Sequence, residues 1–579
     1  MKKAYLSLIA AMSAAPLLAQ HAPDRHPLYD AASPAQEAKQ PAATQLKLAV
    51  MSDTRITTDM KELPVQSPVK VKLSGWRGER CSFQLVVQAN GATRSLRVST
   101  NPLVKNNIRI PFSASMVRYT KASGKVVADI IGTESICDNP AGVLRPIWVQ
   151  VDIPRELKGG TYTGSVEVQA DGCPAVTCSV ELAVCGDMLP PPDAWKMHFD
   201  LWQQPESVAR WHGVKPWSPE HLAIMKPLMK RLADAGQKAI TCAVIDEAWN
   251  GQTYDWFPSQ VEWVMGADGQ MRYDYTAFDT WVEFMMNEVG MKDADIFCYT
   301  MIPWGMNIRY RNEAAEAPAY GTLHLNHKSP EFERVWGHFL KDFRRHLQQK
   351  GWLNRTSIAL DERGDDLVRA AMAAIHKFAP EIRIVSSVNR PSEVSKGVYV
   401  LSPALEHTGM LTPQLKQERK EQGGKTIFYT CCGPQRPNTF TFSQPAEAEW
   451  LPLFAAANHL DGYSRWAYNS WNRNPFECTD FGTWPSGDCF LVYPGNLSSI
   501  RFERMRDGIE EYEKVRILRE RGNTDALDQT LREIFTLKNA SGTNHAQDVQ
   551  RAREAIRKAR NTFVTVGCAF PLEMRAEVW

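Results

Sequence analysis

The sequence has almost no excess of charge of either sign. Its 579 residues include 67 lysines and arginines against 65 aspartates and glutamates, which leaves a formal net charge of +2 at pH 7. A chain with so little net charge has no general attraction for polyanions. We therefore expect a neutral ligand and no nucleic acid partner.

Long hydrophobic runs are missing after the N-terminus. No later segment has the roughly 20 apolar residues that a membrane-spanning helix needs, so no membrane insertion is expected. At the N-terminus, two lysines precede an apolar stretch over 4–19 that ends at a small residue. This pattern predicts a signal peptide over 1–19 and export to the periplasm or the medium. Residues 20–45, rich in Ala, Pro, Gln and Asp, are predicted to form a flexible leader.

Several motifs of cofactor and nucleophile chemistry are absent. The 13 histidines show no HExxH or similar ligand spacing, and there is neither a GxSxG turn nor a GxGxxG turn after the first strand that follows the linker. The segment 423–426 resembles part of a phosphate loop, but Arg419 occupies the place of the first glycine and the segment precedes a strand. We predict no metal and no cofactor.

The cysteines are sparse. Twelve of them are spread along the chain, with no paired CxxC of the zinc-ribbon type. Cys173 and Cys178 could face each other across a hairpin and pair in an oxidising compartment. The alternative is that most cysteines are small buried hydrophobic residues. The pair Cys431-Cys432 is predicted to lie in an apolar strand and to contribute packing.

The chain is too long for one ordinary core, and its patterns change along its length. Alternating polarity over 46–189, with strands such as 82–87 and 147–151, predicts an antiparallel, immunoglobulin-like β-sandwich. Pro190–Pro192 then forms a stiff linker. From about residue 500 the chain becomes helical and charged, with candidate helices over 506–521 and 525–559. This C-terminal segment, 516–579, is predicted to pack on the preceding domain.

Between the linker and that segment, residues 193–515 alternate short apolar strands with amphipathic helical runs. Eight such alternations predict a parallel (β/α)8 barrel, with an open doubly wound sheet as the alternative. The eight candidate strands are 197–202, 239–245, 296–301, 357–361, 382–388, 398–401, 426–431 and 463–467.

Two adjacent carboxylates, Asp361 and Glu362, stand where the fourth of these strands should end. The carboxyl ends of the strands are where a (β/α)8 barrel carries its chemistry. Because neighbouring side chains on a strand point to opposite faces, we expect a turn at Gly364 to let both carboxylates converge. A carboxylate pair is what glycosidic bond cleavage requires. The alternative for so common a dipeptide is a solvated strand end.

Aromatic residues also cluster at the predicted strand ends. Sugars present apolar C–H faces to aromatic rings, while their hydroxyls bind polar side chains. Trp202 ends the first strand, Trp304 follows the third, Tyr429 lies on the seventh, and the run Arg465–Trp471 closes the eighth. The sequence therefore predicts a carbohydrate cleft. The alternative for each aromatic residue is a role in the core.

Several segments, taken in order, resemble glycoside hydrolase family 123 over about residues 195–515. They are Ile358–Glu362, Tyr299–Trp304, Gly462–Trp471, Gly487–Gly495 and Ser499–Glu513. The resemblance implies a barrel preceded by a sandwich. It also implies an exo-acting, retaining β-N-acetylgalactosaminidase that uses the 2-acetamido group of the substrate as nucleophile.

The resemblance further implies a role for each site residue. Asp361 would stay ionised, orient the acetamido N–H and stabilise an oxazolinium-type intermediate, while Glu362 would protonate the leaving oxygen and then activate water. Four aromatic residues would wall the sugar subsite and two polar residues would bind hydroxyls. The aromatic residues are Trp304, Tyr429, Tyr468 and Trp471. The polar residues are Asn469 and Asp488. The alternative for all six is structural support of the barrel rim.

Three functional questions stay open at this level. A β-GlcNAc-specific hexosaminidase differs from a β-GalNAc-specific one only in how the C4 hydroxyl is recognised. A noncatalytic glycan-binding protein is a third possibility. The natural substrate could be a glycosphingolipid oligosaccharide or another glycan with terminal β-GalNAc, and the sequence indicates neither the linkage nor the oligomeric state.

Overall fold

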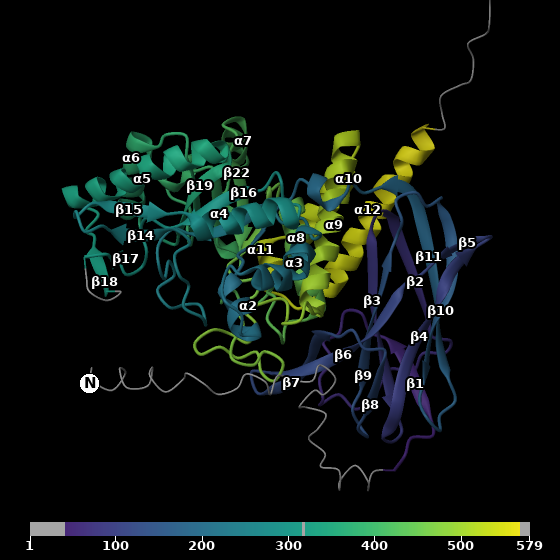
Figure 1. Ribbon diagram of the computed structural model, residues 1–579. Helices are drawn as coiled ribbons and strands as arrows, with labels where there is room; N and C mark the ends of the chain where they lie inside the picture. Colours follow the sequence, from purple (N-terminus) through teal and green to yellow (C-terminus); the bar gives the residue numbers. More distant parts are fainter. Residues whose placement is uncertain (1–40, 315–318, 568–579) are drawn as a thin grey trace, which may run out of the picture.

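The computed structural model describes residues 41–314 and 319–567. Along the chain, a β-sandwich is followed by a parallel eight-stranded barrel and then by a group of helices (Figure 1). The predicted fold class is thereby confirmed. The predicted signal peptide, the leader up to residue 40 and the last twelve residues of the predicted C-terminal segment lie outside the described residues.

Two sheets form the sandwich. The first has the order β1-β3-β9-β6-β7-β24, and the second has the order β2-β11-β10-β4-β5, with β8 paired to β4. Their strands are β1 (Leu46–Val50), β2 (Lys70–Arg77), β3 (Arg80–Ala89), β4 (Thr93–Lys105), β5 (Ile108–Ile110), β6 (Ser113–Ala122), β7 (Lys125–Ile131), β8 (Ile136–Asn139), β9 (Arg145–Asp152), β10 (Gly160–Gln169), β11 (Val176–Met188) and β24 (Ser498–Ser499).

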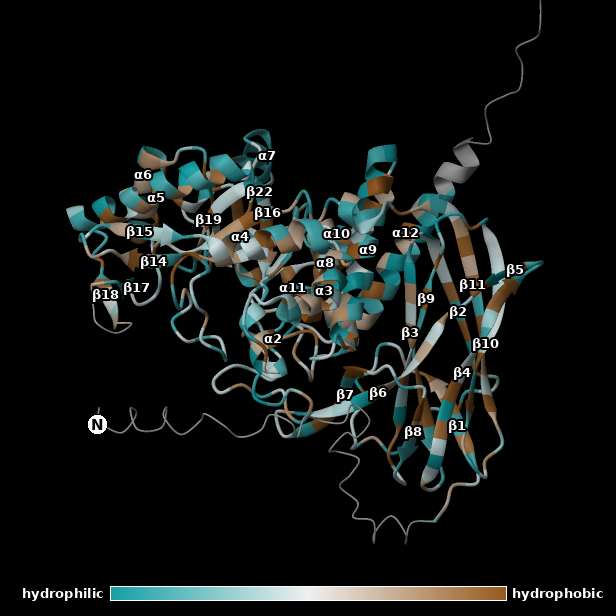
Figure 2. Ribbon diagram, viewed as in Figure 1, coloured by the Kyte–Doolittle hydropathy of each residue, from teal (hydrophilic) through white to brown (hydrophobic). Residues whose placement is uncertain are grey.

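Alternation along the strands produces the sandwich core. In β11, Cys178, Val180, Leu182 and Val184 are buried while residues between them are more exposed, as the period of two requires. Figure 2 shows hydrophobic segments recurring along β11 and β4. In the described part of the chain, Cys178 and Cys173 are both buried free thiols, which agrees with the packing alternative. The pairing is antiparallel as predicted, except that β2 runs parallel to β11.

The barrel sheet has the order β12-β23-β22-β21-β20-β19-β16-β13. Its strands are β12 (His198–Leu201), β13 (Ala239–Ala243), β16 (Asp295–Tyr299), β19 (Thr356–Asp361), β20 (Arg383–Val388), β21 (Val400–Pro403), β22 (Lys425–Tyr429) and β23 (Gly462–Arg465). Each overlaps one of the eight predicted strands. β12 and β13 meet through few contacts, including a hydrogen bond of 2.9 Å from Lys238 N to Phe199 O. The barrel is therefore nearly closed.

Continuous apolar runs explain why these strands could be recognised. All five residues of β13 are buried, and so are the first five of β19. When both faces of a parallel sheet are covered, the sequence of each strand is an almost unbroken hydrophobic segment.

The loops after β13 and β16 carry a small sheet that the sequence did not predict. β14 (Glu262–Met265), β15 (Met271–Asp274), β17 (Asn307–Asn312) and β18 (Ala319–His324) pair in the order β15-β14-β17-β18. This insertion sheet lies at the end of the molecule farthest from the sandwich (Figure 1). Its strands are short and only partly buried, so their apolar periodicity is weak.

The α-helices cover the barrel and fill its junction with the sandwich (Figure 1). They are α2 (Pro205–His212), α3 (Pro219–Ala233), α4 (Thr276–Glu283), α5 (Pro330–Lys350), α6 (Asp365–Phe378), α7 (Pro413–Glu421), α8 (Pro445–Ala457), α9 (Ile500–Arg521), α10 (Asp525–Ile534), α11 (Leu537–Ala540) and α12 (His545–Gly567). The single helical run predicted over 525–559 is thus divided among α10, α11 and α12. No helix within the described ranges combines the length and apolar character needed to cross a bilayer.

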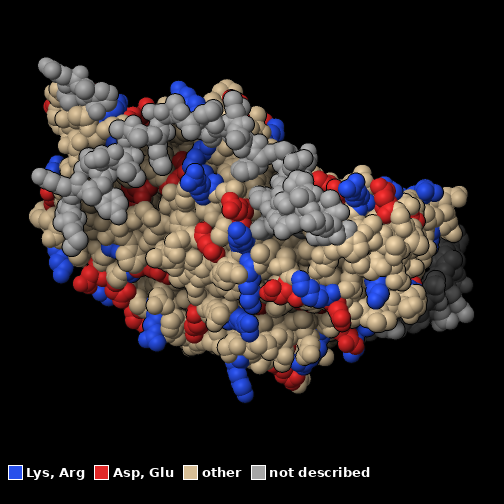
Figure 3. All heavy atoms as spheres, turned by 90° about the horizontal axis from the view of Figure 1, so that it is seen from below, with Lys and Arg blue, Asp and Glu red and all other residues tan. Residues whose placement is uncertain are grey.

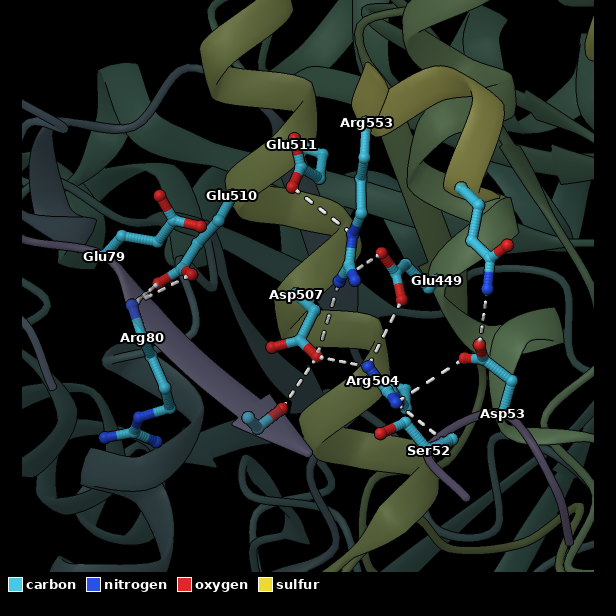
Figure 4. A network of polar contacts seen from close by, with 12 residues as sticks. Ser52, Asp53, Glu79, Arg80, Glu449, Arg504, Asp507, Glu510, Glu511 and Arg553 are labelled. Carbon is cyan, nitrogen blue, oxygen red and sulfur yellow. Dashed lines mark hydrogen bonds and ion pairs between the residues drawn. The ribbon is translucent and has the colours of Figure 1, made fainter. Parts of the chain in front are cut away.

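A buried network of charged side chains joins the sandwich to the helices (Figure 4). Arg504 of α9 donates to Ser52 O at 2.8 Å and to the Asp507 carboxylate at 3.1 Å, and it lies 3.6 Å from both Asp53 and Glu449. Arg553 of α12 approaches Glu449 at 2.6 Å. Because α9 also leads directly from β24, which extends a sandwich sheet, the two domains share both a sheet and an ion-pair network.

Candidate active site

Asp361 and Glu362 line one cavity at the carboxyl end of the barrel. Asp361 is the last residue of β19, and Glu362 follows it. The cavity has a volume of about 80 Å³. Its walls are formed by Trp202, Trp249, Gln252, Asp361, Glu362, Ser387, Tyr429, Cys431, Cys432, Ser464, Arg465, Trp466, Trp484 and Asp488. The two carboxylates therefore converge, as the sequence predicts.

The turn that allows this convergence lies at Glu362 itself. Glu362 adopts a left-handed backbone conformation with φ of 51°, which is uncommon for a residue other than glycine. Its backbone N–H donates to Ser387 O on β20 at 2.9 Å. Gly364, where the turn was predicted, has φ of −66° and ψ of 153° and precedes α6. That part of the prediction was wrong, because an unfavourable conformation of a functional residue cannot be read from local preference.

Asp361 is held in a poorly hydrated position. Burial raises its pKa to about 7, and the neighbouring Glu362 charge acts in the same direction. A hydrogen bond from the Trp304 side chain and the charge of Arg363 partly oppose this rise. Burial thus favours the protonated form of Asp361, and the ionised carboxylate expected from the sequence needs partners that offset it.

Tyr429 anchors Glu362. The Tyr429 hydroxyl, at the end of β22, donates a hydrogen bond to Oε1 of Glu362. Burial and the Glu362 charge raise the pKa of Tyr429, so the hydroxyl stays a donor at neutral pH. One oxygen of Glu362 is thereby oriented while Oε2 has no such contact with Tyr429.

A buried ion pair contributes to the cavity wall. Arg465, at the end of β23, donates to Oδ1 of Asp488 at 2.5 Å, and Trp466 Nε1 donates to Oδ2 at 3.1 Å. The side chains of Arg465 and Asp488 are both fully buried. Asp488 lies in the site, as predicted, and its two oxygens already have these partners.

Four tryptophans supply the aromatic walls. Trp202 and Trp249 stack with ring centroids 5.6 Å apart, and Trp466 meets Trp484 edge-on at 6.1 Å. Trp202 and Trp466 belong to the aromatic clusters seen in the sequence. Trp249 and Trp484 were missed, because they lie in loops several residues beyond the strand ends and no local pattern indicates where those loops fold.

Four predicted sugar-binding residues are outside the cavity lining. One of them, Trp304, is exposed and hydrogen-bonds Asp361, and the other three are buried. Tyr468 is buried and donates to Leu228 O at 2.9 Å, and Trp471 is buried and donates to Val492 O at 2.8 Å. Asn469 bonds through its side chain to both the N–H and the carbonyl of Gln204. The positions of these three residues correspond to the alternative of structural support for the barrel rim.

Cys431 and Cys432 also line the cavity, contrary to the predicted packing within a strand. β22 ends at Tyr429, so the two cysteines lie in the loop that follows it. Their sulfur atoms are 3.8 Å apart, and Cys432 is exposed. The apolar run extends beyond the hydrogen-bonded strand, which explains the error.

The arrangement suits acid–base chemistry on a neutral, partly apolar ligand. Two carboxylates, one of them oriented by Tyr429, lie against aromatic walls that a sugar ring can stack on. Figure 3 shows basic and acidic side chains interspersed on one face of the molecule. Across the described residues, no group of three or more His, Cys, Asp or Glu side chains is placed to hold a metal ion.

Comparisons with known proteins agree with this architecture. Residues 202–518 match the family model of the catalytic domain of glycoside hydrolase 123, and residues 51–170 match that of the N-terminal domain of the same family. The fold is similar to a family 123 glycoside hydrolase from Clostridium perfringens, studied for glycolipid glycan hydrolysis. That comparison has a TM-score of 0.83 and 22% identity, over 90% of this chain and 100% of the other.

More distant structures give much weaker similarity. A Bacteroides ovatus GH5 xyloglucanase has a TM-score of 0.30 and 9% identity, over 80% of this chain and 100% of its own. No curated protein matches the sequence.

Proposed function

Because the chain belongs to glycoside hydrolase family 123, we propose that it is a β-N-acetylgalactosaminidase that releases terminal β-linked GalNAc from glycans. The observation that carries the proposal is the convergence of Asp361 and Glu362 on one aromatic-walled cavity. The reaction proceeds with retention of configuration, and the 2-acetamido oxygen of the substrate attacks the anomeric carbon.

The two carboxylates have different tasks. Asp361 accepts a hydrogen bond from the acetamido N–H and stabilises the positive charge that develops on the oxazolinium-type ring. Bonding to that N–H and to a developing cation favours the ionised carboxylate, which offsets the effect of burial on the pKa of Asp361. Glu362 protonates the leaving oxygen and then activates water. No enzyme nucleophile is needed, so the usual carboxylate-separation rule does not apply.

The shape of the site supports action at chain ends. The cavity is small and lies at the end of the barrel strands, with the paired Arg465 and Asp488 among its lining residues. A single terminal sugar suits a cavity of this size, with the rest of the glycan outside. The similar enzyme from Clostridium perfringens was studied with glycolipid glycans, which makes glycosphingolipid oligosaccharides a reasonable first set of substrates.

A screen of aryl glycosides tests the activity and its specificity. The β-GalNAc glycoside should be cleaved much faster than the β-GlcNAc glycoside, and a plain β-galactoside should not be cleaved because it lacks the amide. A thiazoline mimic of the intermediate should inhibit strongly. Faster cleavage of β-GlcNAc would indicate a hexosaminidase of the other specificity, and glycan binding without release would indicate a noncatalytic protein. Equal turnover of the galactoside would contradict the substrate-assisted mechanism.

We also propose that the protein is exported, because of the basic and apolar N-terminal pattern over residues 1–19. N-terminal sequencing of the protein recovered from the producing cell tests this proposal. A mature chain that begins near residue 20 is expected, and a chain that retains Met1 inside the cell would contradict it.

A further inference from the structure

The exposed aromatic side chains of the protein are concentrated on one side of the barrel mouth. In the described part of the chain, the large aromatic side chains that are substantially exposed are Tyr254, Trp256, Trp304 and Tyr320, with exposed fractions of 41%, 56%, 42% and 52%. All four lie in the segments inserted after β13 and β16. Exposed aromatic residues gathered in this way mark an interaction site more often than scattered ones do.

Two of these rings enclose an arginine. The guanidinium carbon of Arg309, on β17, lies 3.6 Å from the ring centroid of Tyr320 and 5.7 Å from that of Trp256. Asp246 accepts a hydrogen bond from Arg309 at 3.2 Å, which fixes the guanidinium in place. We call Trp256, Arg309 and Tyr320 the outer platform. It combines flat apolar surfaces with oriented donors, which is the chemistry that binds the faces and hydroxyls of sugars.

The outer platform borders a second, larger cavity. Arg309 and Tyr320 line a hollow of about 410 Å³, compared with about 80 Å³ for the catalytic cavity. Polar side chains from the loop after β13 and from the insertion sheet contribute to its walls. They include Asp246, Gln260, Glu262 and Asp274. A volume of this size, lined by both acceptors and aromatic rings, is within the range of ligand pockets.

Covalent and packing connections place the outer platform close to the catalytic pair. Trp304, which hydrogen-bonds Asp361, precedes Arg309 by five residues, and a chain of that length spans at most about 18 Å. On the other side, Trp256 is followed by Phe257, whose ring packs on Trp249 of the catalytic cavity at 4.9 Å. The platform thus lies near the loops that line the catalytic cavity.

We propose that the outer platform binds the sugars on the leaving-group side of the scissile bond. The preferred substrate is then an oligosaccharide with at least two sugars beyond the terminal GalNAc, rather than a short glycoside. This proposal rests on the proposed function, because it requires that the terminal residue occupies the catalytic cavity. The platform recognises the sugars themselves, whether the glycan is free or attached to lipid.

The test compares two substrates on three proteins. Trp256→Ala and Tyr320→Ala should each lower kcat/KM for a free tetrasaccharide with terminal β-GalNAc by about tenfold, mainly through KM, because each removes one stacking surface. Activity on an aryl β-GalNAc glycoside, which does not reach the platform, should stay within about twofold of wild type. Ile136→Ala serves as the control, since Ile136 is 55% exposed on β8 of the sandwich. It should change neither activity.

The outcomes separate this proposal from the proposed function. Equal losses on both substrates, or no loss on the tetrasaccharide, would overturn the platform while leaving the enzyme assignment intact. If wild type cleaved neither substrate, the proposed function would fail, and the platform with it. In a second arm the same glycan is presented on ceramide in detergent. A similar loss supports glycan binding, whereas a loss confined to the ceramide-linked form would indicate contact with lipid and overturn the proposal.

Discussion

Asp361 and Glu362 are consecutive residues whose side chains line the same cavity. An extended strand would point them to opposite faces. The left-handed conformation of Glu362, with φ of 51°, brings its carboxylate back toward that of Asp361. The hydrogen bonds from Glu362 N to Ser387 O and from Tyr429 to the Glu362 carboxylate hold this arrangement from two other strands.

Substitution of the acid residue should have effects that depend on the leaving group. Glu362→Gln removes the proton donor, so activity on a glycoside with a poor leaving group should fall by about 10²- to 10⁴-fold. Activity on an activated aryl glycoside should fall far less in the first step, since that leaving group departs without protonation. Steady-state and burst kinetics on both substrates provide the measurement. Glu393→Gln, with a side chain 84% exposed, is the matched control. Equal losses on both substrates would exclude the acid role.

Removal of the Tyr429 hydroxyl should weaken catalysis without unfolding the barrel. Tyr429→Phe loses a hydrogen bond to a carboxylate, for which about 10- to 100-fold in kcat/KM is expected. Tyr399→Phe is a close control, because Tyr399 also donates to a carboxylate, that of Asp295, but at the opposite end of the barrel strands. A loss of activity in Tyr399→Phe as large as in Tyr429→Phe would indicate a general effect on the fold.

The raised pKa of Asp361 predicts a pH-dependent gain in stability for Asp361→Asn. The folded protein holds this proton up to about pH 7, whereas the unfolded chain releases it near the ordinary value of 3.8. Wild-type stability therefore falls as the pH rises between these values, and the loss is complete above pH 7. Asn mimics the neutral acid, so the variant should be more stable than wild type at pH 8 by up to about 4 kcal/mol, and about equal at pH 4. Thermal unfolding at both pH values checks this, and an equal difference at both would contradict it.

The buried network around Arg504 should be important for stability. Arg504→Met removes the buried Arg504 guanidinium from Asp507 and Glu449 (Figure 4) and leaves them Ser82 and Arg553 as partners, so a loss of up to about 3–5 kcal/mol is expected. Arg334→Met removes an exposed pair with Glu331 and should cost less than about 1 kcal/mol. Urea unfolding curves of the two variants provide the comparison. Similar midpoints for both would show that the network contributes little.

The position of Cys432 predicts sensitivity to thiol reagents. A hydrogen bond with Cys431 lowers the pKa of Cys432, and its exposed thiol lies at the catalytic cavity. N-ethylmaleimide should therefore inactivate the enzyme, and a thiazoline inhibitor should protect it. Cys432→Ser should resist inactivation, while Cys137→Ser, in the sandwich, should be inactivated like wild type. Inactivation of Cys432→Ser at the wild-type rate would place the reactive thiol elsewhere.

Much of the architecture follows from local patterns. The eight barrel strands are recognisable because each is a short run buried on both faces, and the position of Asp361 follows from where the fourth run ends. The insertion sheet was not recognisable, since its strands are short and half-exposed. The residues that hold the outer platform together were missed for the same reason.

The order of the domains, the positions of the apolar runs and the carboxylate pair at a strand end follow from the sequence alone. All three depend only on neighbours along the chain. Long-range packing determines which aromatic residues line the cavity. Trp249 and Trp484 reach the cavity, whereas Tyr468 and Trp471 are buried behind it. The physical reason is that a tryptophan or tyrosine is equally suited to a core and to a sugar site, and long-range packing alone selects between them.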